Sequence, residues 1–202
     1  MIPLEVRDLI DAAVHTAIYD AFHRYPDGLE SRCAHYAIVG SKCLSRLTGE
    51  SHIPVCGSQL IPVVSGGFYA IAPPPAAIEG ADELSDLRNY HCWIEAAHGE
   101  SVDVIDFTLR HNLAACQLLG IPLAQSTEEP YAWVTMPKAL CGQCVPEKRF
   151  AYTSCLARDA QLTNLLWEFQ FENNRVFDVL SDKALQIVSD ALQSFLTDAV
   201  ET

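Results

Sequence analysis

The chain has 202 residues, half of them apolar and 19% charged, a composition that predicts a folded protein with a hydrophobic core. The formal net charge of −13 would repel nucleic acid and anionic membrane surfaces, so neither is an expected partner. No apolar run reaches the roughly 20 residues of a membrane span. We therefore expect a single domain over residues 1–202 that acts on a small molecule or a peptide.

The N-terminal part of the chain predicts two helices. Pro3 opens an apolar repeat of helical spacing that continues to Phe22. This helix should end before the turn-forming residues 25–28. A second apolar stripe predicts a helix over residues 31–47, which Gly49 would close.

The middle of the chain predicts strands. Residues 73–89 form a long segment rich in proline, alanine and acidic residues, which is either an active-site lid or a surface loop. The pattern after this segment predicts two strands that form a hairpin with its turn at His98-Gly99. The expected strands are residues 52–64, 67–72, 90–97 and 101–107.

The C-terminal part, residues 109–202, predicts more strands and helices. We expect helices at 109–119, 159–171 and 176–200, and strands at 131–136 and 149–156. The order of helices, then strands, then helices predicts an α+β fold with a mostly antiparallel sheet.

The eight cysteines are spread along the chain, and we expect them to be reduced. A chain of this length does not need disulfides for its stability. The N-terminal segment carries Glu5, Asp8 and Asp11 and lacks the pattern of a secretory signal, which predicts a cytoplasmic protein. Most of the cysteines lie in apolar stretches, where a free cysteine behaves as a small hydrophobic residue. They are Cys33, Cys43, Cys56, Cys92, Cys116, Cys141, Cys144 and Cys155.

Cys33 is the candidate nucleophile. If Ser31 caps the second helix, Cys33 lies in its first turn, where the helix dipole and free backbone N–H groups favour a thiolate. The same N–H groups could bind the oxyanion of a tetrahedral intermediate. The alternative is that Cys33 is an ordinary core cysteine on the buried stripe of the helix.

His91 and Asp106 are the candidate base and its orienting carboxylate. A two-residue turn at His98-Gly99 places His91 directly opposite Asp106, on the same face of the hairpin. A carboxylate there would fix the imidazole tautomer and support the imidazolium. Asp103 is the competing carboxylate, but this register directs it to the other face. The alternative is an exposed cross-strand pair without a catalytic role.

The order of these features resembles the transglutaminase-like branch of the papain-like cysteine proteinase superfamily. The resemblance rests on a cysteine at a helix start, the pattern HxWxE at residues 91–95, and the pattern DxT at residues 106–108. It covers residues 30–108, about two fifths of the chain, and suggests a divergent bacterial branch. It implies a papain-like or transglutaminase-like core, in which the nucleophile-bearing helix packs on the sheet, with extra C-terminal helices.

The resemblance also implies a catalytic triad of Cys33, His91 and Asp106 acting as nucleophile, base and orienter. The expected activity is cysteine-dependent acyl chemistry, with hydrolysis of an amide or peptide bond favoured over acyl transfer. Two departures stand out: Phe107 replaces a proline often found between the aspartate and the threonine, and no glutamine or asparagine closely precedes Cys33 as an oxyanion donor. Tyr25 could substitute for that donor. The alternative function is a non-catalytic binding module that retains the fold.

Cys141 and Cys144 have the spacing of a metal knuckle. A structural zinc site needs four ligands, and the sequence has no second CxxC or HxxxH pattern. We therefore expect no metal and no cofactor. A small zinc protein built around this pair is the third reading.

Overall fold

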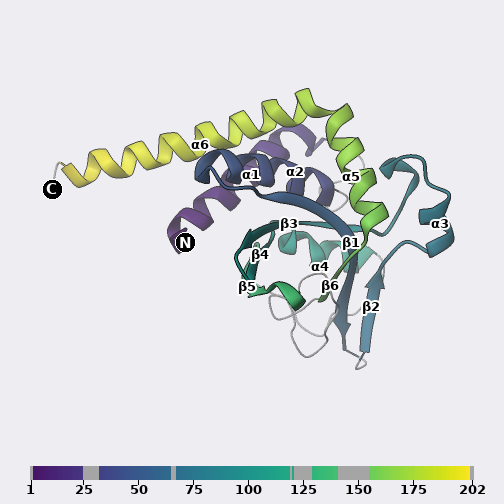
Figure 1. The fold of residues 1–202 in the computed structure, drawn as a ribbon. Helices are drawn as coiled ribbons and strands as arrows, with labels where there is room; N and C mark the ends of the chain where they lie inside the picture. Colours follow the sequence, from purple (N-terminus) through teal and green to yellow (C-terminus); the bar gives the residue numbers. More distant parts are fainter. Residues whose placement is uncertain are drawn as a thin grey trace.

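The computed structural model describes residues 2–24, 32–64, 67–118, 120, 129–140 and 155–200. They form an α+β structure in which a curled antiparallel sheet lies beside a layer of helices (Figure 1). The helices are α1 (Leu4–Phe22), α2 (Cys33–Thr48), α3 (Pro75–Glu79), α4 (Leu109–Leu118), α5 (Ala160–Glu172) and α6 (Asn174–Val200). The strands are β1 (Ile53–Val63), β2 (Gly67–Ile71), β3 (His91–His98), β4 (Ser101–Asp106), β5 (Ala132–Pro137) and β6 (Cys155–Arg158). Two short 3₁₀ turns, Leu84–Asp86 and Lys138–Leu140, complete the described elements.

The two predicted N-terminal helices are confirmed. Pro3 stands at the N-cap of α1, because its fixed φ suits a helix start and its missing N–H is not needed there. Gly49 ends α2 in a left-handed conformation with φ of 72°, and its N–H bonds the carbonyl of Ser45 at 3.0 Å. A glycine adopts this conformation without the strain of a side chain, which is why the helix ends there.

The sheet has the strand order β2-β1-β3-β4-β5. Strand β6 pairs with β1 beyond the start of β3, on the edge of β1 that faces away from β2. Every pairing is antiparallel, as the sequence predicts. Strand β6 continues to Arg158, beyond the predicted end at residue 156, because Arg158 still pairs with Gly57 of β1. Asp159 then caps α5 by accepting a hydrogen bond from the N–H of Leu162.

Residues 73–89 are not the continuous loop that the sequence predicts. They contain α3 and the 3₁₀ turn Leu84–Asp86, in which Glu83 and Asp86 cap each other's backbone N–H groups. The turn buries Leu84 and is followed by the buried Leu87, so this segment is anchored to the core. Its role as a lid stays a prediction.

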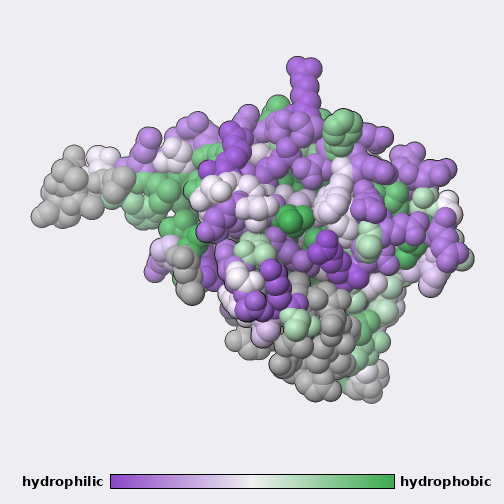
Figure 2. Space-filling view, viewed as in Figure 1, coloured by the Kyte–Doolittle hydropathy of each residue, from purple (hydrophilic) through white to green (hydrophobic). Residues whose placement is uncertain are grey.

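One face of the sheet packs against α2 and α5, while α1 and α6 pack on α2, and this layer forms the larger part of the core. The opposite face carries a second apolar cluster around Val55, Trp93 and Val104. Helix α6 runs on past the body of the molecule to the C-terminus (Figure 1). Hydrophobic residues lie beneath this projecting end (Figure 2), where Phe195 is 69% exposed. Among the helices of the described ranges, none is long and apolar enough to cross a membrane.

Gly40 sets how closely α2 approaches the sheet. A Cβ added at Gly40 would lie 2.6 Å from the ring of Phe107 and 2.8 Å from the side chain of Ile94. These neighbours are fully or almost fully buried and have no free space to move into. The close approach of α2 to Phe107 therefore requires glycine at this position.

We predict that Gly40→Ala destabilises the protein by about 1–3 kcal/mol, the usual cost of overpacking a core. Urea unfolding followed by circular dichroism measures this free energy. Gly67→Ala is the control, since a Cβ at Gly67 meets no atom within 4 Å. Equal stability of the Gly40→Ala variant and the wild type would contradict the close packing.

Candidate active site

Cys33 lies at the start of α2, in the first turn of the helix, as predicted. The residue in the capping position is Arg32, not Ser31, and its side chain does not cap the helix. Ser31 lies outside the described residues. Cys33 is 9% exposed, and its Sγ is 3.8 Å from the carbonyl oxygen of Tyr90. The side chain therefore points toward the beginning of β3.

The surroundings of Cys33 favour its thiolate. A hydrogen bond from the Cys92 thiol lowers the pKa of Cys33, and the positive charge of His91 lowers it further. Burial and the negative charge of Asp106 act in the opposite direction but do not outweigh these effects. Cys43, further along the same helix, is the contrast, because burial raises its pKa to about 12.

His91 and Asp106 form a buried ion pair. The Nε2 atom of His91 is 2.9 Å from Oδ2 of Asp106, and the two side chains are 5% and 0% exposed. Burial would lower the pKa of His91, but the charge and hydrogen bond of Asp106 raise it above its ordinary value. For Asp106, burial would raise the pKa, but His91 and Thr108 together lower it. The pair is therefore stabilised in its charged form, and Nδ1 is the nitrogen that Asp106 leaves available.

The predicted contact of His91 with Asp106 is present, but the predicted register was wrong. His98 pairs with Ser101, so the turn is Gly99-Glu100 and not His98-Gly99. Gly99 has a φ of 58°, and a glycine with positive φ suits the first position of a two-residue hairpin turn. The turn therefore moves by one residue to use this glycine.

The contact survives because the moved turn shifts the strand pairing by two residues. An even shift keeps every side chain on its predicted face. Continued beyond the last pair, Ile94 with Ile105, the register puts Trp93 opposite Asp106. His91 then meets Asp106 across a diagonal, which long side chains can span.

Asp103 does not contact His91. It opposes Ala96 and lies on the other face of the hairpin, as predicted. Its carboxylate accepts hydrogen bonds from Trp133 Nε1 at 3.1 Å and from Thr135 Oγ1 at 2.5 Å. Asp106 is therefore the carboxylate that orients His91.

Thr108 gives the DxT pattern a physical role. Its N–H and its hydroxyl both donate to Oδ1 of Asp106, at 2.8 and 2.5 Å. These bonds hold the oxygen that His91 does not use, and they compensate for removing the carboxylate from water. Phe107 between them packs against α2, which explains how a bulky residue is accommodated where the related pattern has proline.

No hydrogen bond joins Cys33 to His91 within the described structure. The Cys33 thiol instead contacts the Tyr90 carbonyl and the Cys92 thiol. The two residues are nevertheless coupled electrostatically, since each shifts the pKa of the other toward its charged form. The Cys33 side chain would have to rotate to exchange these contacts for a hydrogen bond with His91.

Trp93 and Glu95 lie on the same face of β3 as His91, as expected. The Trp93 ring is 6.3 Å from the His91 ring, centroid to centroid, and nearly parallel to it. Its Nε1 donates to Glu95, and Arg158 of β6 also donates to Glu95 at 3.2 Å. Trp93 thus forms a rigid wall beside the imidazole.

Gln59 is a buried residue of this face that the sequence analysis missed. It lies on β1, two residues from Gly57, which pairs with His91. Gln59 is 0% exposed, and within the part of the chain that the structure describes neither its amide oxygen nor its amide nitrogen has a hydrogen-bond partner. An unpaired buried amide lowers the free energy of unfolding by about 1–3 kcal/mol, so its presence calls for an explanation. The alternation of side chains along β1 could have predicted the face of the sheet on which Gln59 lies. It could not have predicted that the Gln59 amide lacks partners.

Other residues from the sequence analysis give no further support for a site. Tyr25, Cys141 and Cys144 lie outside the described residues, so the question of an oxyanion donor at Tyr25 or of zinc at the cysteine pair stays open. Across the described ranges, no group of three or more histidine, cysteine or acidic side chains could hold a metal. Within the same ranges, the free cysteines are Cys33, Cys43, Cys56, Cys92 and Cys116.

Comparisons with known proteins show the fold alone. A scan of protein-family models finds no match, and a search of curated proteins finds none. One solved crystal structure, whose title identifies only a genomics target, is similar in fold with a TM-score of 0.58. The similarity covers 92% of this chain and 79% of that chain, at 14% sequence identity.

We predict that Asp106→Asn lowers the pKa of His91 below its ordinary value of 6.5, because burial then outweighs the remaining attraction to Cys33. In the wild type, protonated His91 stabilises the folded protein at pH values below 6.5, because its pKa is raised on folding. This stabilisation is lost as the pH rises through the folded-state pKa. In the variant, His91 should instead cost stability as the pH falls. NMR titration of the imidazole and urea unfolding across the histidine range measure both effects.

Asp103→Asn is the control for this prediction, since Asp103 lies on the other face and bonds Trp133 and Thr135. It should leave the pKa of His91 unchanged. An unchanged His91 titration in Asp106→Asn would show that the buried pair does not govern the imidazole.

Proposed function

We propose that this protein is a cysteine hydrolase of the transglutaminase-like branch of the papain-like superfamily, and that it cleaves an amide or peptide bond. The observation that carries the proposal is the buried His91–Asp106 pair beside a cysteine whose pKa is lowered at a helix N-terminus. Perturbed groups of this kind cluster where proteins carry out chemistry. The overall α+β fold, with α2 packed on the sheet, supports the same assignment.

In the proposed reaction, the Cys33 thiolate attacks the carbonyl carbon of the substrate. A C–S bond forms, and the carbonyl electron pair moves to oxygen to give an oxyanion. When the intermediate collapses, the C–N bond breaks and the His91 imidazolium gives its Nδ1 proton to the leaving amine. Asp106 keeps the other nitrogen, Nε2, protonated and oriented throughout.

Water completes the proposed cycle. Neutral His91 takes a proton from a water molecule that attacks the thioester carbonyl, and a second oxyanion forms. Its collapse breaks the C–S bond, releases the acid and restores the thiolate–imidazolium pair. The Trp93 ring beside His91 would limit how the imidazole can turn between the two steps.

We assign Gln59 as a hydrogen-bond donor to the oxyanion, together with the backbone N–H groups at the start of α2. Its amide is buried on the face that carries His91 and has no hydrogen-bond partner among the described residues. A substrate oxygen would supply the missing acceptor. Such donors typically contribute 10²- to 10³-fold to the rate.

We predict that iodoacetamide labels Cys33 rapidly and that the rate stays substantial below neutral pH, because the Cys92 hydrogen bond and the charge of His91 lower the pKa of Cys33. His91→Ala should reduce the rate strongly, and Asp106→Asn should reduce it less, because Asp106 acts by orienting His91. Mass spectrometry of the labelled peptide measures the rate at each cysteine. Cys43 is the internal control and should stay unlabelled, since burial raises its pKa to about 12.

If Cys33 alkylates no faster than a free thiol, the hydrolase proposal fails. The alternative function would then stand, in which the chain is a binding module that retains this fold without the chemistry.

We predict that Gln59→Leu slows acylation of Cys33 by p-nitrophenyl acetate about 10²- to 10³-fold while alkylation by iodoacetamide changes less than about twofold. Acylation passes through an oxyanion, whereas alkylation is a direct displacement at carbon and does not. The variant should also be at least as stable as the wild type, because leucine removes an unpaired buried amide. Stopped-flow release of p-nitrophenol, mass spectrometry and thermal unfolding measure the three effects.

Gln161→Leu is the matched control, because Gln161 is exposed and bonds the carbonyl of Ile78 on the surface. It should change neither rate. Equal losses of acylation and alkylation in Gln59→Leu would mean that the substitution disturbs Cys33 itself, and the donor role would be wrong.

A further inference from the structure

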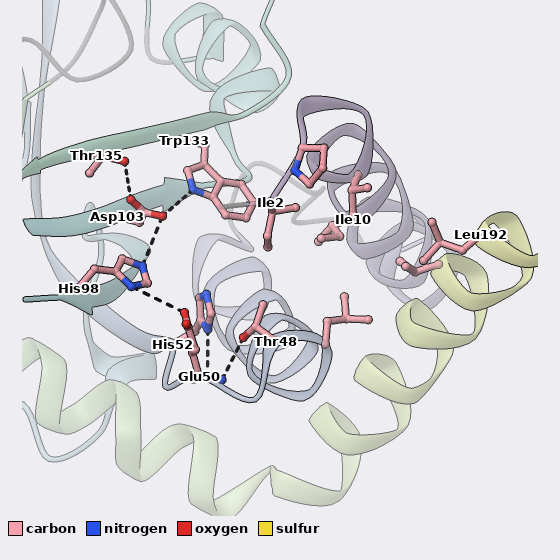
Figure 3. Close-up of a pocket in the computed structure, with 14 residues that line it drawn as sticks. Ile2, Ile10, Thr48, Glu50, His52, His98, Asp103, Trp133, Thr135 and Leu192 are labelled. Atoms are coloured by element: carbon pink, nitrogen blue, oxygen red, sulfur yellow. Dashed lines mark hydrogen bonds and ion pairs between the residues drawn. The ribbon is translucent and has the colours of Figure 1, made fainter. Parts of the chain in front are cut away.

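A pocket of about 580 Å³ lies at the C-terminal end of α2 (Figure 3). The helix has 16 residues, so its two ends are about 24 Å apart at a rise of 1.5 Å per residue. Cys33 begins the helix, whereas Leu47 and Thr48 at its end line this pocket. None of the residues that line it belongs to the proposed catalytic site, so it is a separate cavity of the size typical for small ligands.

One wall of the pocket is aliphatic and is built by helices. Figure 3 shows Ile2 and Ile10 from the N-terminal segment and Leu192 from α6 on this side. Val6, Leu47 and Val188 complete the wall. These branched side chains offer apolar surface to the body of a ligand, and burying that surface favours binding.

The opposite wall is acidic and comes from the hairpin end of the sheet and the loop after α2 (Figure 3). Its two carboxylates are Asp103 and Glu50, and His98 stands between them at 3.6 and 3.7 Å. Trp133 and Thr135 hold Asp103 in place by donating hydrogen bonds to it. Asp103 is therefore held at the cavity, whereas Glu50 lies at its exposed rim.

The charge of this wall selects the ligand. Among the described residues that line the pocket there is no lysine or arginine. The second imidazole there, His52, has a pKa lowered by burial, so it does not supply a positive charge at neutral pH. Two carboxylates with at most one charged histidine give the lining a negative charge, in a chain whose net charge is −13. Arg7, which lies over the Trp133 ring at 4.6 Å from its centroid, offsets part of this charge from outside the lining.

We propose that this pocket binds a small amphipathic amine, with an aliphatic or alicyclic body and a protonated amino group. The body would lie against the aliphatic wall, and the ammonium would lie at the acidic wall, where Asp103 and Glu50 attract it and one of them accepts its hydrogen bond. An alcohol of the same shape would gain only the apolar contact, and a carboxylate would be repelled. The site is independent of the hydrolase proposal, since the two share no residue.

The test compares three probes with the same body: cyclohexylmethylamine, cyclohexylmethanol and cyclohexanecarboxylate. The readout is the indole N–H NMR signal of Trp133, whose Nε1 bonds Asp103 at the pocket. Trp93 and Trp167 are internal controls, since their indoles bond Glu95 and the Pro54 carbonyl elsewhere. A Trp133→Phe variant assigns the signal.

We expect the amine to shift the Trp133 signal saturably, with the alcohol binding at least tenfold more weakly and the carboxylate not binding. Added salt should reduce the preference for the amine, because the carboxylates lie near solvent. The double variant Glu50→Gln, Asp103→Asn should bring amine and alcohol within twofold of each other. Glu79→Gln, at an exposed position on α3, is the control and should leave the preference unchanged.

Glu50→Gln alone serves if the double variant does not fold, because Glu50 is largely exposed and should weaken amine binding about threefold. Three outcomes would overturn the proposal: an alcohol that binds as tightly as the amine, equal shifts at Trp93 or Trp167, or no saturable shift at Trp133.

Discussion

The buried contact between His91 and Asp106 is the interaction on which the candidate chemistry depends. Two charges removed from water are costly unless hydrogen bonds replace the lost solvation. Thr108 supplies those bonds to the carboxylate oxygen that His91 leaves free. The hairpin β3–β4 must therefore keep its curvature and pairing, because the His91, Asp106 and Thr108 side chains come from its ends.

Packing between the sheet and α2 positions Cys33 at the beginning of β3. Gly40 lets the helix lie against Phe107 and Ile94, and this contact determines where the first turn of α2 reaches the sheet. Cys33 thereby meets Tyr90 and Cys92 at the beginning of β3. A bulky Phe107 between Asp106 and Thr108 is thus part of the helix–sheet interface rather than a defect in the pattern.

The two ends of α2 differ in chemistry because they lie near different ends of the β3–β4 hairpin. At the N-terminal end, buried groups stabilise a thiolate and an imidazolium. At the C-terminal end, an open cavity combines an aliphatic wall with the carboxylates of Asp103 and Glu50. The two sites use opposite faces of the β3–β4 hairpin. Asp103 and Asp106 lie an odd number of positions apart along β4, and such side chains point to opposite faces of a sheet.

The sequence by itself determined the helices except α3, most strands and the faces that Cys33, His91 and Asp106 occupy, because hydrophobic period and turn residues are local properties. It misplaced the hairpin turn by one residue, since glycine conformation decides between adjacent turns. Only the tertiary structure decided that Gln59 lacks hydrogen-bond partners among the described residues and that Thr108 holds Asp106. It also decided that six segments line the pocket at the C-terminal end of α2. Hydrogen-bond satisfaction and cavities depend on residues distant in the chain, and no local pattern records them.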